Sequence, residues 1–173
     1  MKHKCHLQTP IGIICIEEDE EAVTALFVDN AYKERYHLCR SDGEMRFLEE
    51  PESAILKMAG TQLMEYFQGK RKDFSLPLSP KGTEFQKRVW EALRSIPYGQ
   101  TKSYGEIAAQ IGNPKACRAV GGANNKNPIM IFIPCHRVIG ADGSLVGFGG
   151  GLRAKRYMLD LEKGDSEAGG LNC

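Results

Sequence analysis

The sequence lacks any long hydrophobic segment. Its longest uninterrupted apolar run covers only residues 129–133, whereas a helix that crosses a bilayer needs about 20 apolar residues. The first residues, MKHKCHLQ, contain two lysines, but neither an apolar stretch nor a small-residue cleavage site follows them, as a secretory signal requires. We therefore expect a globular protein of the cytoplasm that does not bind membranes.

The cysteines lack any regular spacing. They stand at positions 5, 15, 39, 117, 135 and 173 without a C-x-x-C pair, so neither a zinc ribbon nor a disulfide framework is indicated. His3, Cys5, His6 and Cys15 could meet across a hairpin and hold zinc, but their spacing matches no standard site. We therefore predict no metal and no cofactor, and interpret these side chains as ordinary surface or core residues.

The chain has almost no net charge, but its two halves carry net charges of opposite sign. The net charge is +1, yet residues 1–80 carry 10 basic and 14 acidic side chains, and residues 81–173 carry 13 and 8. Between positions 85 and 156 the count is 11 basic to 3 acidic. This bias favours a polyanionic partner, of which nucleic acid is the commonest, although a solvated basic surface has the same composition.

The first half has the pattern of a small sheet covered by a helix. Apolar and polar residues alternate over 5–8, 11–16 and 23–28, which predicts an antiparallel meander. Apolar residues at steps of four predict a helix over 53–67 that covers this sheet. The prolines of SLPLSPKG then mark a boundary near residue 80.

The helix caps and breaks of the second half predict a mostly helical segment. Thr83 with Gln86 forms a capping box before a helix that ends at Pro97, and Ser103 with Glu106 forms another. Pro114 opens a third helix. The last two helices form a helix-turn-helix at about 103–124, a pattern that also occurs in proteins that never bind DNA. We predict an α+β fold with a sheet-bearing N-terminal subdomain, 1–80, and a mostly helical C-terminal domain, 81–173.

A possible nucleophile follows the helix-turn-helix. The apolar run 129–133 predicts a buried strand, and Pro134, Cys135 and His136 come directly after it. A thiol beside an imidazole can form an activated nucleophile, whereas most lone cysteines are inert core residues. Neighbouring residues of a regular strand point to opposite sides, so cooperation would require a turn or a bridging water. A closing helix over 152–161 ends next to Glu162.

These motifs together resemble the 6-O-alkylguanine-DNA alkyltransferases, most closely the free-standing bacterial and archaeal type. The segments that carry the resemblance are 85–92 (FQKRVWEA), 96–107 (IPYGQTKSYGEI), 112–123 (GNPKACRAVGGA), 127–128 (NP), 134–140 (PCHRVIG) and 147–161. The front subdomain matches only in length and in its loose meander. The resemblance implies a DNA repair protein that acts once, as a methylated-DNA-protein-cysteine S-methyltransferase, on O-alkylated guanine and thymine in duplex DNA.

The resemblance also implies a role for each member of the catalytic group. Cys135 would accept the alkyl group irreversibly, and His136 would act as base through a water. Glu162 would orient that histidine, and Asn127 would brace the turn before the cysteine. Tyr104 would rotate the nucleotide and offer its hydroxyl to the leaving guanine.

Further residues are implied in DNA and base binding. Arg118 would fill the gap that the flipped base leaves, and small residues would let the second helix of the motif approach the minor groove: Ala119, Gly121, Gly122 and Ala123. Val138 and Gly149 would line the base pocket with Phe148 and Met130. Phe148, Gly149 and Met130 depart from the tyrosine, serine and proline of some relatives, which leaves the pocket size open.

Two other functions compete with alkyl transfer. The chain could be a helix-turn-helix DNA-binding module without chemistry, with Cys135 as a core thiol, or a Cys-His hydrolase. A single, non-symmetric motif without an obvious dimerisation helix weighs against a regulator, and we expect a monomer. No signature of an acyl-substrate pocket supports the hydrolase.

Overall fold

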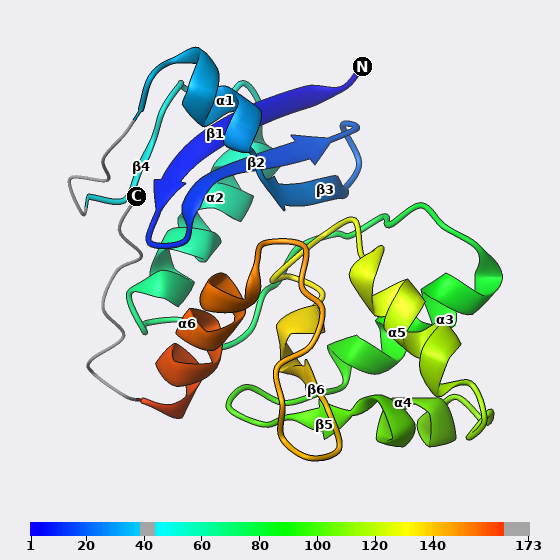
Figure 1. The fold of residues 1–173 in the computed structure, drawn as a ribbon. Helices are drawn as coiled ribbons and strands as arrows, with labels where there is room; N and C mark the ends of the chain where they lie inside the picture. Colours follow the sequence, from blue (N-terminus) through cyan, green and yellow to red (C-terminus); the bar gives the residue numbers. More distant parts are fainter. Residues whose placement is uncertain (39–43, 165–173) are drawn as a thin grey trace.

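The computed structural model describes residues 1–38 and 44–164. The strands are β1 (His3–Thr9), β2 (Gly12–Glu18), β3 (Val23–Val28), β4 (Arg46–Phe47), β5 (Lys102–Ser103) and β6 (Val138–Ile139). The α-helices are α1 (Asn30–Arg35), α2 (Ala54–Phe67), α3 (Glu84–Arg94), α4 (Tyr104–Gln110), α5 (Cys117–Asn125) and α6 (Leu152–Lys163), and a 3-10 turn, η1, covers Cys135–Arg137. The chain has the predicted α+β class (Figure 1).

The first half forms the predicted antiparallel sheet. Its strand order is β3-β2-β1-β4, and β1 pairs with β2 in a register that sets His6 opposite Cys15. Helix α2 begins at its Ser53 cap and packs on β1 and β2. The approach is close, because a Cβ at Gly60 would lie 2.3 Å from the Phe47 ring. Helix α1 and strand β4 are short, and neither was predicted from the sequence.

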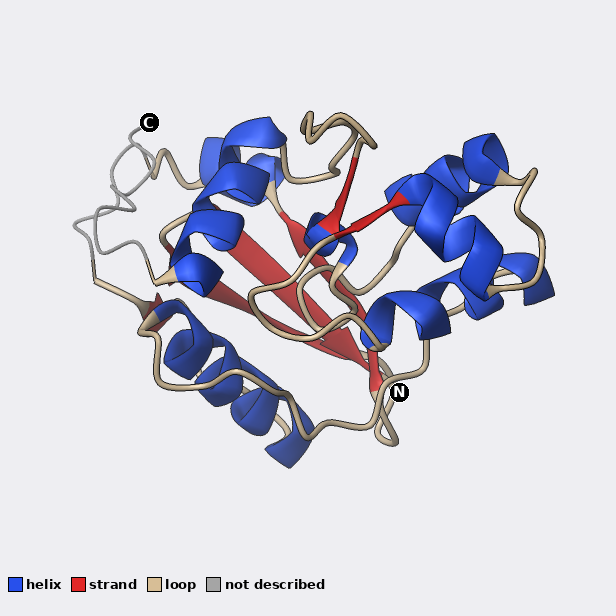
Figure 2. Cartoon of the chain, turned by 90° about the horizontal axis from the view of Figure 1, so that it is seen from below, coloured by secondary structure: helices blue, strands red, loops and turns tan. Residues whose placement is uncertain are grey.

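Helices α3, α4 and α5 form a separate group beside the sheet (Figure 2). The predicted capping boxes at Thr83 and Ser103 are both present. Helix α5 begins at Cys117 rather than at Pro114, because residues 114–116 form a turn. Trp90 of α3 is buried, and its Nε1 donates to the Ala123 carbonyl at 2.8 Å, so α3 fixes the position of α5.

The two halves share one hydrophobic core. The outer edge of β3 is covered by the segment before residue 80 and by the loop before Cys135: the N–H of Val23 donates to Pro77 O and that of Leu26 donates to Pro128 O, both at 2.9 Å. Pairing of this kind protects a sheet edge from association with other chains. It also fixes the loop before Cys135 against the sheet. The division into 1–80 and 81–173 stays a prediction.

The predicted strand over 129–133 is wrong. Ile131 has a φ of 71°, and the Phe132 N–H donates to Met130 O at 2.8 Å, so the segment is a tight buried loop. A short apolar run indicates burial but cannot distinguish a strand from another buried conformation. The loop is closed by Asn127, whose side chain accepts from the Ile129 N–H at 3.0 Å and donates to Ile133 O at 2.8 Å.

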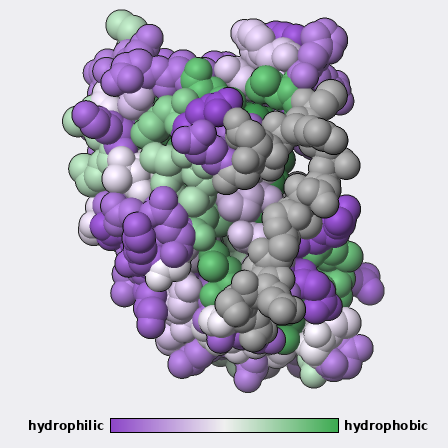
Figure 3. Space-filling view, turned by 90° about the vertical axis from the view of Figure 1, so that its left-hand side faces the viewer, coloured by the Kyte–Doolittle hydropathy of each residue, from purple (hydrophilic) through white to green (hydrophobic). Residues whose placement is uncertain are grey.

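The outer surface is mostly polar on the side that lies at the left of Figure 1. Among the described residues that Figure 3 shows on that side, hydrophilic residues lie mainly toward the margins, with hydrophobic residues in a strip between them. Among the described residues, no helix is both long enough and apolar enough to cross a membrane.

Candidate active site and nucleic-acid interface

Cys135 lies at the start of the 3-10 turn η1, directly after the loop that Asn127 closes. The turn brings Cys135 and His136 out of strand geometry, as Pro134 before them suggests. Both side chains are buried, with residue exposures of 3% and 0%. The turn continues into β6, which pairs with β5 in parallel. Since β5 leads directly into Tyr104, the helix-turn-helix is joined to the cysteine by this two-stranded sheet.

Glu162 is the centre of a buried hydrogen-bond network. Its Oε2 accepts from His136 Nε2 and, at 2.6 Å, from the Tyr66 hydroxyl. Its Oε1 accepts from Arg137 Nε at 2.7 Å and from the Gly99 N–H at 3.1 Å. These partners come from α2, from η1 and from the loop after α3, so the network ties both halves of the chain to the turn that carries Cys135.

The network fixes the protonation of His136. Burial alone would raise the pKa of Glu162, but the hydrogen bond from His136 and the charge of Arg137 outweigh it and lower that pKa to about 2. Burial lowers the pKa of His136. The neutral ring therefore keeps its proton on Nε2, because an ionised carboxylate can only accept. Its Nδ1 is buried without a hydrogen-bond partner among the described residues and is free to accept a proton.

The Cys135 thiol is protonated in the resting protein. Burial raises its pKa to about 11, although a hydrogen bond from the Asn127 side chain and the charge of Lys155 act in the opposite direction. Because the thiolate is the nucleophile, a base must take the thiol proton. The predicted group of Cys135, His136, Glu162 and Asn127 thus comes together in one buried site.

Lys155 is a buried cation that the sequence analysis missed. It lies on α6 with a residue exposure of 0%, and its Nζ donates to Val138 O at 2.5 Å and to Val146 O at 3.0 Å. Its charge lowers the pKa of Cys135. A signal was available, because Lys155 stands three residues before Met158 on the apolar side of the predicted helix, where an apolar residue is expected.

We expect Lys155→Met to slow the alkyl transfer that the resemblance implies, without unfolding the chain. The methionine keeps the apolar stem but removes the charge that favours the thiolate, and a loss of one pKa unit corresponds to about a tenfold effect. Two buried carbonyls lose their donor, at a cost of roughly 1–3 kcal/mol. The measurements are the rate with the free alkylated base and the denaturation midpoint. Lys163→Met, at the exposed end of the same helix, is the control, and an unchanged rate in Lys155→Met would contradict the assigned role.

Tyr104 lies between the helix-turn-helix and the cysteine. Its hydroxyl donates to Val146 O at 2.8 Å, and its pKa is raised by burial and by the neighbouring Cys135. The ring also lies beside α5, since a Cβ at Gly121 would approach it to 3.9 Å. An alanine at position 121 would make an ordinary van der Waals contact with the Tyr104 ring, so only a side chain that extends beyond Cβ would crowd it.

The outer face of α5 is exposed and carries small residues. Arg118, Ala119 and Gly122 are solvent-exposed, and a Cβ at Gly122 would meet nothing within 4 Å. Ala123 does not share this surface: it is 3% exposed and packs toward α3, whose Trp90 binds its carbonyl. Its small size serves helix packing, so the predicted role of Ala123 in close approach to DNA is not supported.

Three of the four residues predicted to line a base pocket, Met130, Phe148 and Gly149, lie close together. A Cβ at Gly149 would lie 3.8 Å from Met130 Sδ, and one at Gly150 would lie 2.9 Å from both Met130 and Phe148. Met130 therefore packs beneath the 148–150 loop. Val138 is buried, and its carbonyl binds Lys155.

Tyr66 and Arg137 were also missed as members of the Glu162 network. Arg137 belongs to the PCHRV motif, but nothing in the sequence distinguishes it from a solvated charge; in the structure its Nη1 donates to Ile96 O at 2.8 Å. Tyr66 is next to Phe67 on α2, more than ninety residues from Glu162 in the sequence. Only the tertiary fold brings such a pair together.

The fold and site together define a helix-turn-helix protein with a buried cysteine beside a histidine-carboxylate pair. Family models for 6-O-methylguanine DNA methyltransferase match nearly the whole chain: the ribonuclease-like domain matches residues 3–80 and the DNA binding domain matches residues 84–164. The chain belongs to the 6-O-methylguanine DNA methyltransferase family.

Individual relatives agree with this assignment. The chain is 47% identical over 160 residues to the methylated-DNA–protein-cysteine methyltransferase of Methanosarcina acetivorans, covering 90% of this chain and 94% of that protein. It is 44% identical to the constitutive enzyme of Bacillus subtilis, with 94% and 96% covered. The crystal structure of the Mycobacterium tuberculosis O6-methylguanine methyltransferase superposes with a TM-score of 0.79 at 43% identity, over 97% of this chain and 96% of that one. A structure of the Mycobacterium tuberculosis protein in complex with DNA gives 0.76 at 43% identity, over 92% and 91%.

Proposed function

We propose that the protein repairs DNA by moving an alkyl group from O-alkylated guanine, and from O-alkylated thymine, to Sγ of its own Cys135. The observation that carries this proposal is the buried Cys135 beside the His136–Glu162 pair, joined through β5 and β6 to a helix-turn-helix. The names of the relatives, methylated-DNA–protein-cysteine methyltransferases, support the same activity. Intact mass after incubation with methylated and unmethylated duplex tests it.

The site's electrostatics support a stepwise proton transfer. The Cys135 thiol gives its proton to His136 Nδ1 through one bridging water, while Glu162 holds the opposite ring nitrogen. The thiolate then attacks the alkyl carbon, so that a carbon–sulfur bond forms as the carbon–oxygen bond to the base breaks. The guanine takes up a proton as it leaves, and we assign this donation to the Tyr104 hydroxyl. The thioether has no easy route back, and each chain acts once.

The exposed face of α5 supports a minor-groove interface. The small side chains of Ala119 and Gly122 leave its backbone accessible, and Arg118 stands among them at the surface. We infer that this face enters the groove and that Arg118 occupies the place of the extruded base, which costs a few kcal/mol in lost stacking. Met130, Phe148, Gly149 and Val138 would then surround the flipped base.

We expect affinity for undamaged duplex to be independent of sequence and steeply dependent on salt. Neutralised phosphates release counterions, so about four phosphate contacts would weaken binding roughly 100-fold between 50 and 200 mM salt. Fluorescence anisotropy over a salt series measures the slope. Lys115→Ala, in the turn before α5, should reduce the slope by about one contact, whereas Lys57→Ala on α2 should not change it. Salt-insensitive binding, or preference for one unmodified sequence, would favour a regulator instead.

The remaining assignments are proposals of the same kind. We infer that the protein acts as a monomer in the cytoplasm without a cofactor, that residues 81–173 bind DNA through the motif at 103–124, and that residues 1–80 supply the sheet against which the reactive turn is held.

A further inference from the structure

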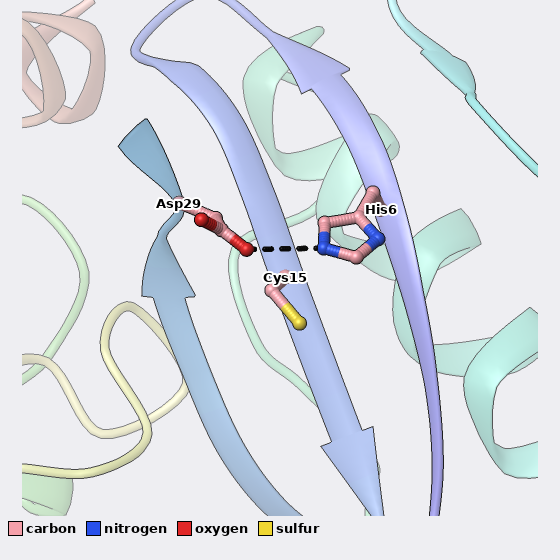
Figure 4. Close-up of side chains that lie close together, drawn as sticks. All are labelled: His6, Cys15 and Asp29. Atoms are coloured by element: carbon pink, nitrogen blue, oxygen red, sulfur yellow. Dashed lines mark hydrogen bonds and ion pairs between the residues drawn. The ribbon is translucent and has the colours of Figure 1, made fainter. Parts of the chain in front are cut away.

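A second cluster of ligand-type side chains lies on the sheet, away from the reactive cysteine. His6 of β1 and Cys15 of β2 are cross-strand partners, and Asp29 follows β3 as the N-cap of α1. Figure 4 shows the three side chains pointing toward one another over one face of the sheet. One ligand atom from each, an imidazole nitrogen, a thiol sulfur and a carboxylate oxygen, lies within 4.8 Å of the other two.

Neighbouring groups hold the two polar members of this cluster in place. His6 presents Nε2 to Asp29 Oδ2 at 3.1 Å, while its Nδ1 binds Glu49 Oε1 at 2.6 Å. The other Glu49 oxygen accepts from the Tyr32 hydroxyl at 3.0 Å, and Asp29 Oδ1 accepts from the Tyr32 N–H at 2.9 Å. A carboxylate on the far nitrogen of a ligating histidine is the usual support of a metal site, since it fixes the tautomer and the ring orientation.

The cluster is partly enclosed but open to solvent on one side. The Cys15 residue is 1% exposed, the His6 side chain is 4% exposed and the Asp29 side chain is 20% exposed. A cavity of about 320 Å³ adjoins His6, Asp29, Tyr32 and Glu49. A small ion can therefore enter from this cavity, and water can supply a fourth ligand.

We propose that His6, Cys15 and Asp29 bind one zinc ion, with water from the cavity as fourth ligand. One nitrogen, one sulfur and one oxygen donor match the ligands that zinc accepts in tetrahedral sites. Tetrahedral bonds of about 2.0–2.3 Å place the ligand atoms roughly 3.3–3.7 Å apart. His6 Nε2 and Asp29 Oδ2, now 3.1 Å apart, would therefore separate slightly, and the widest pair, now within 4.8 Å, would close by about 1 Å. The ion takes the place of the proton in the hydrogen bond between His6 Nε2 and Asp29 Oδ2. That proton and the Cys15 thiol proton both pass to solvent. The ion's two positive charges balance the thiolate and the Asp29 carboxylate.

This site differs from the four-residue set considered from the sequence. Cys5 neighbours His6 and therefore points to the opposite face, into the core beneath α2. His3 lies apart, with its Nδ1 3.0 Å from Glu52. Asp29 could not be recognised, because its approach to His6 depends on how β3 leads into α1. Zinc would tie two strands to the start of that helix, and this proposal does not depend on alkyl transfer.

The test is titration of chelator-treated protein with cobalt(II) and then with zinc(II). We expect one equivalent of cobalt to give a thiolate charge-transfer band and tetrahedral d–d bands, which zinc then displaces. Cys15→Ser should lose the charge-transfer band and weaken zinc binding at least 100-fold. Cys5→Ser, buried on the other face of the same sheet, and Cys117→Ser, exposed on α5, should retain both. Persistence of the band in Cys15→Ser, or its absence from the unmodified protein, would overturn the proposal.

A second variant decides the question if Cys15→Ser does not fold. Asn caps a helix as well as Asp does, so Asp29→Asn keeps the cap of α1 while it removes the carboxylate. We expect its zinc affinity to fall at least tenfold, and the zinc-induced rise in Tm seen with the unmodified protein to shrink. Glu49→Gln, which touches His6 but not the ion, should weaken binding about tenfold. Zinc affinity in Asp29→Asn equal to that of the unmodified protein would refute the site.

Discussion

Cys135→Ala is expected to abolish alkyl transfer while leaving affinity for duplex DNA unchanged. The sulfur is the acceptor in the proposed reaction, and no other described thiol adjoins the His136–Glu162 pair. Cys135 is buried inside the turn and takes no part in the exposed face of α5, which carries Arg118, Ala119 and Gly122. Removing one buried sulfur costs some stability, but the backbone of η1 is held by the Asn124 side chain, which donates to Cys135 O at 3.4 Å.

The measurement is intact mass during incubation with a methylated duplex in excess. The unmodified protein should gain the mass of one methyl group and then stop, and peptide mapping should find that group on Cys135. Cys117 is the matched control, since it is an exposed thiol at the start of α5, the helix that we propose enters the groove, and Cys117→Ala should react normally. Several turnovers per chain, or a methyl group on Cys117 or Cys5, would contradict the proposed mechanism.

The sequence predicts those elements whose signals are local. The caps at Thr83 and Ser103 and the stripes of apolar residues set the helices α3, α4 and α6, and Pro134 indicates the departure from strand geometry at Cys135. The run 129–133 was misread because its five apolar residues indicate burial, and the positive φ of Ile131 has no local signal. Helix α1 begins at a good cap, Asp29, but has no buried residue to give it an apolar stripe.

The candidate site also contains residues that a local motif predicts and residues that only the tertiary fold brings in. Cys135 and His136 are neighbours in one motif, and Glu162 was added only through the resemblance to a family. Tyr66 reaches Glu162 from α2, and Lys155 reaches the carbonyls of Val138 and Val146. Tyr66 and Glu162 are far apart in the chain, and the partners of Lys155 lie outside its own helix, so these contacts depend on tertiary packing rather than on any repeat or cap. The resemblance predicts Cys135 as the reacting group, and the structure adds the residues that hold this cysteine and its histidine in place.

Arg118→Ala is expected to slow repair of a lesion in duplex DNA roughly 100-fold and to leave reaction with the free alkylated base unchanged. Extruding a base costs a few kcal/mol, and about 2.7 kcal/mol left uncompensated corresponds to that factor. Arg118 is exposed on α5 and, within the described part of the chain, has no hydrogen bond or ion pair to another residue, so its loss should not disturb the fold.

Glu162→Gln is the contrasting variant, because its effect should be the same on both substrates. The carboxylate orients His136, and proton removal from the Cys135 thiol precedes reaction with duplex and with free base alike. General-base catalysis is worth about 100-fold or more, so both rates should fall by a similar factor of that order. In this variant Arg137 loses its charged partner at 2.7 Å. A denaturation curve therefore checks that the site stays folded.

The decisive quantity is therefore, for each variant, the rate constant with duplex divided by the rate constant with free base. Both are measured with protein in excess at saturating concentration, so that weaker DNA binding does not affect the rate constant with duplex. The ratio should fall about 100-fold in Arg118→Ala and stay constant in Glu162→Gln. Arg118→Lys keeps the charge but not the planar guanidinium. A ratio between those of the unmodified protein and Arg118→Ala would show how much of the effect comes from charge and how much from stacking. Equal losses on both substrates in Arg118→Ala would remove that residue from base extrusion, because free base requires none.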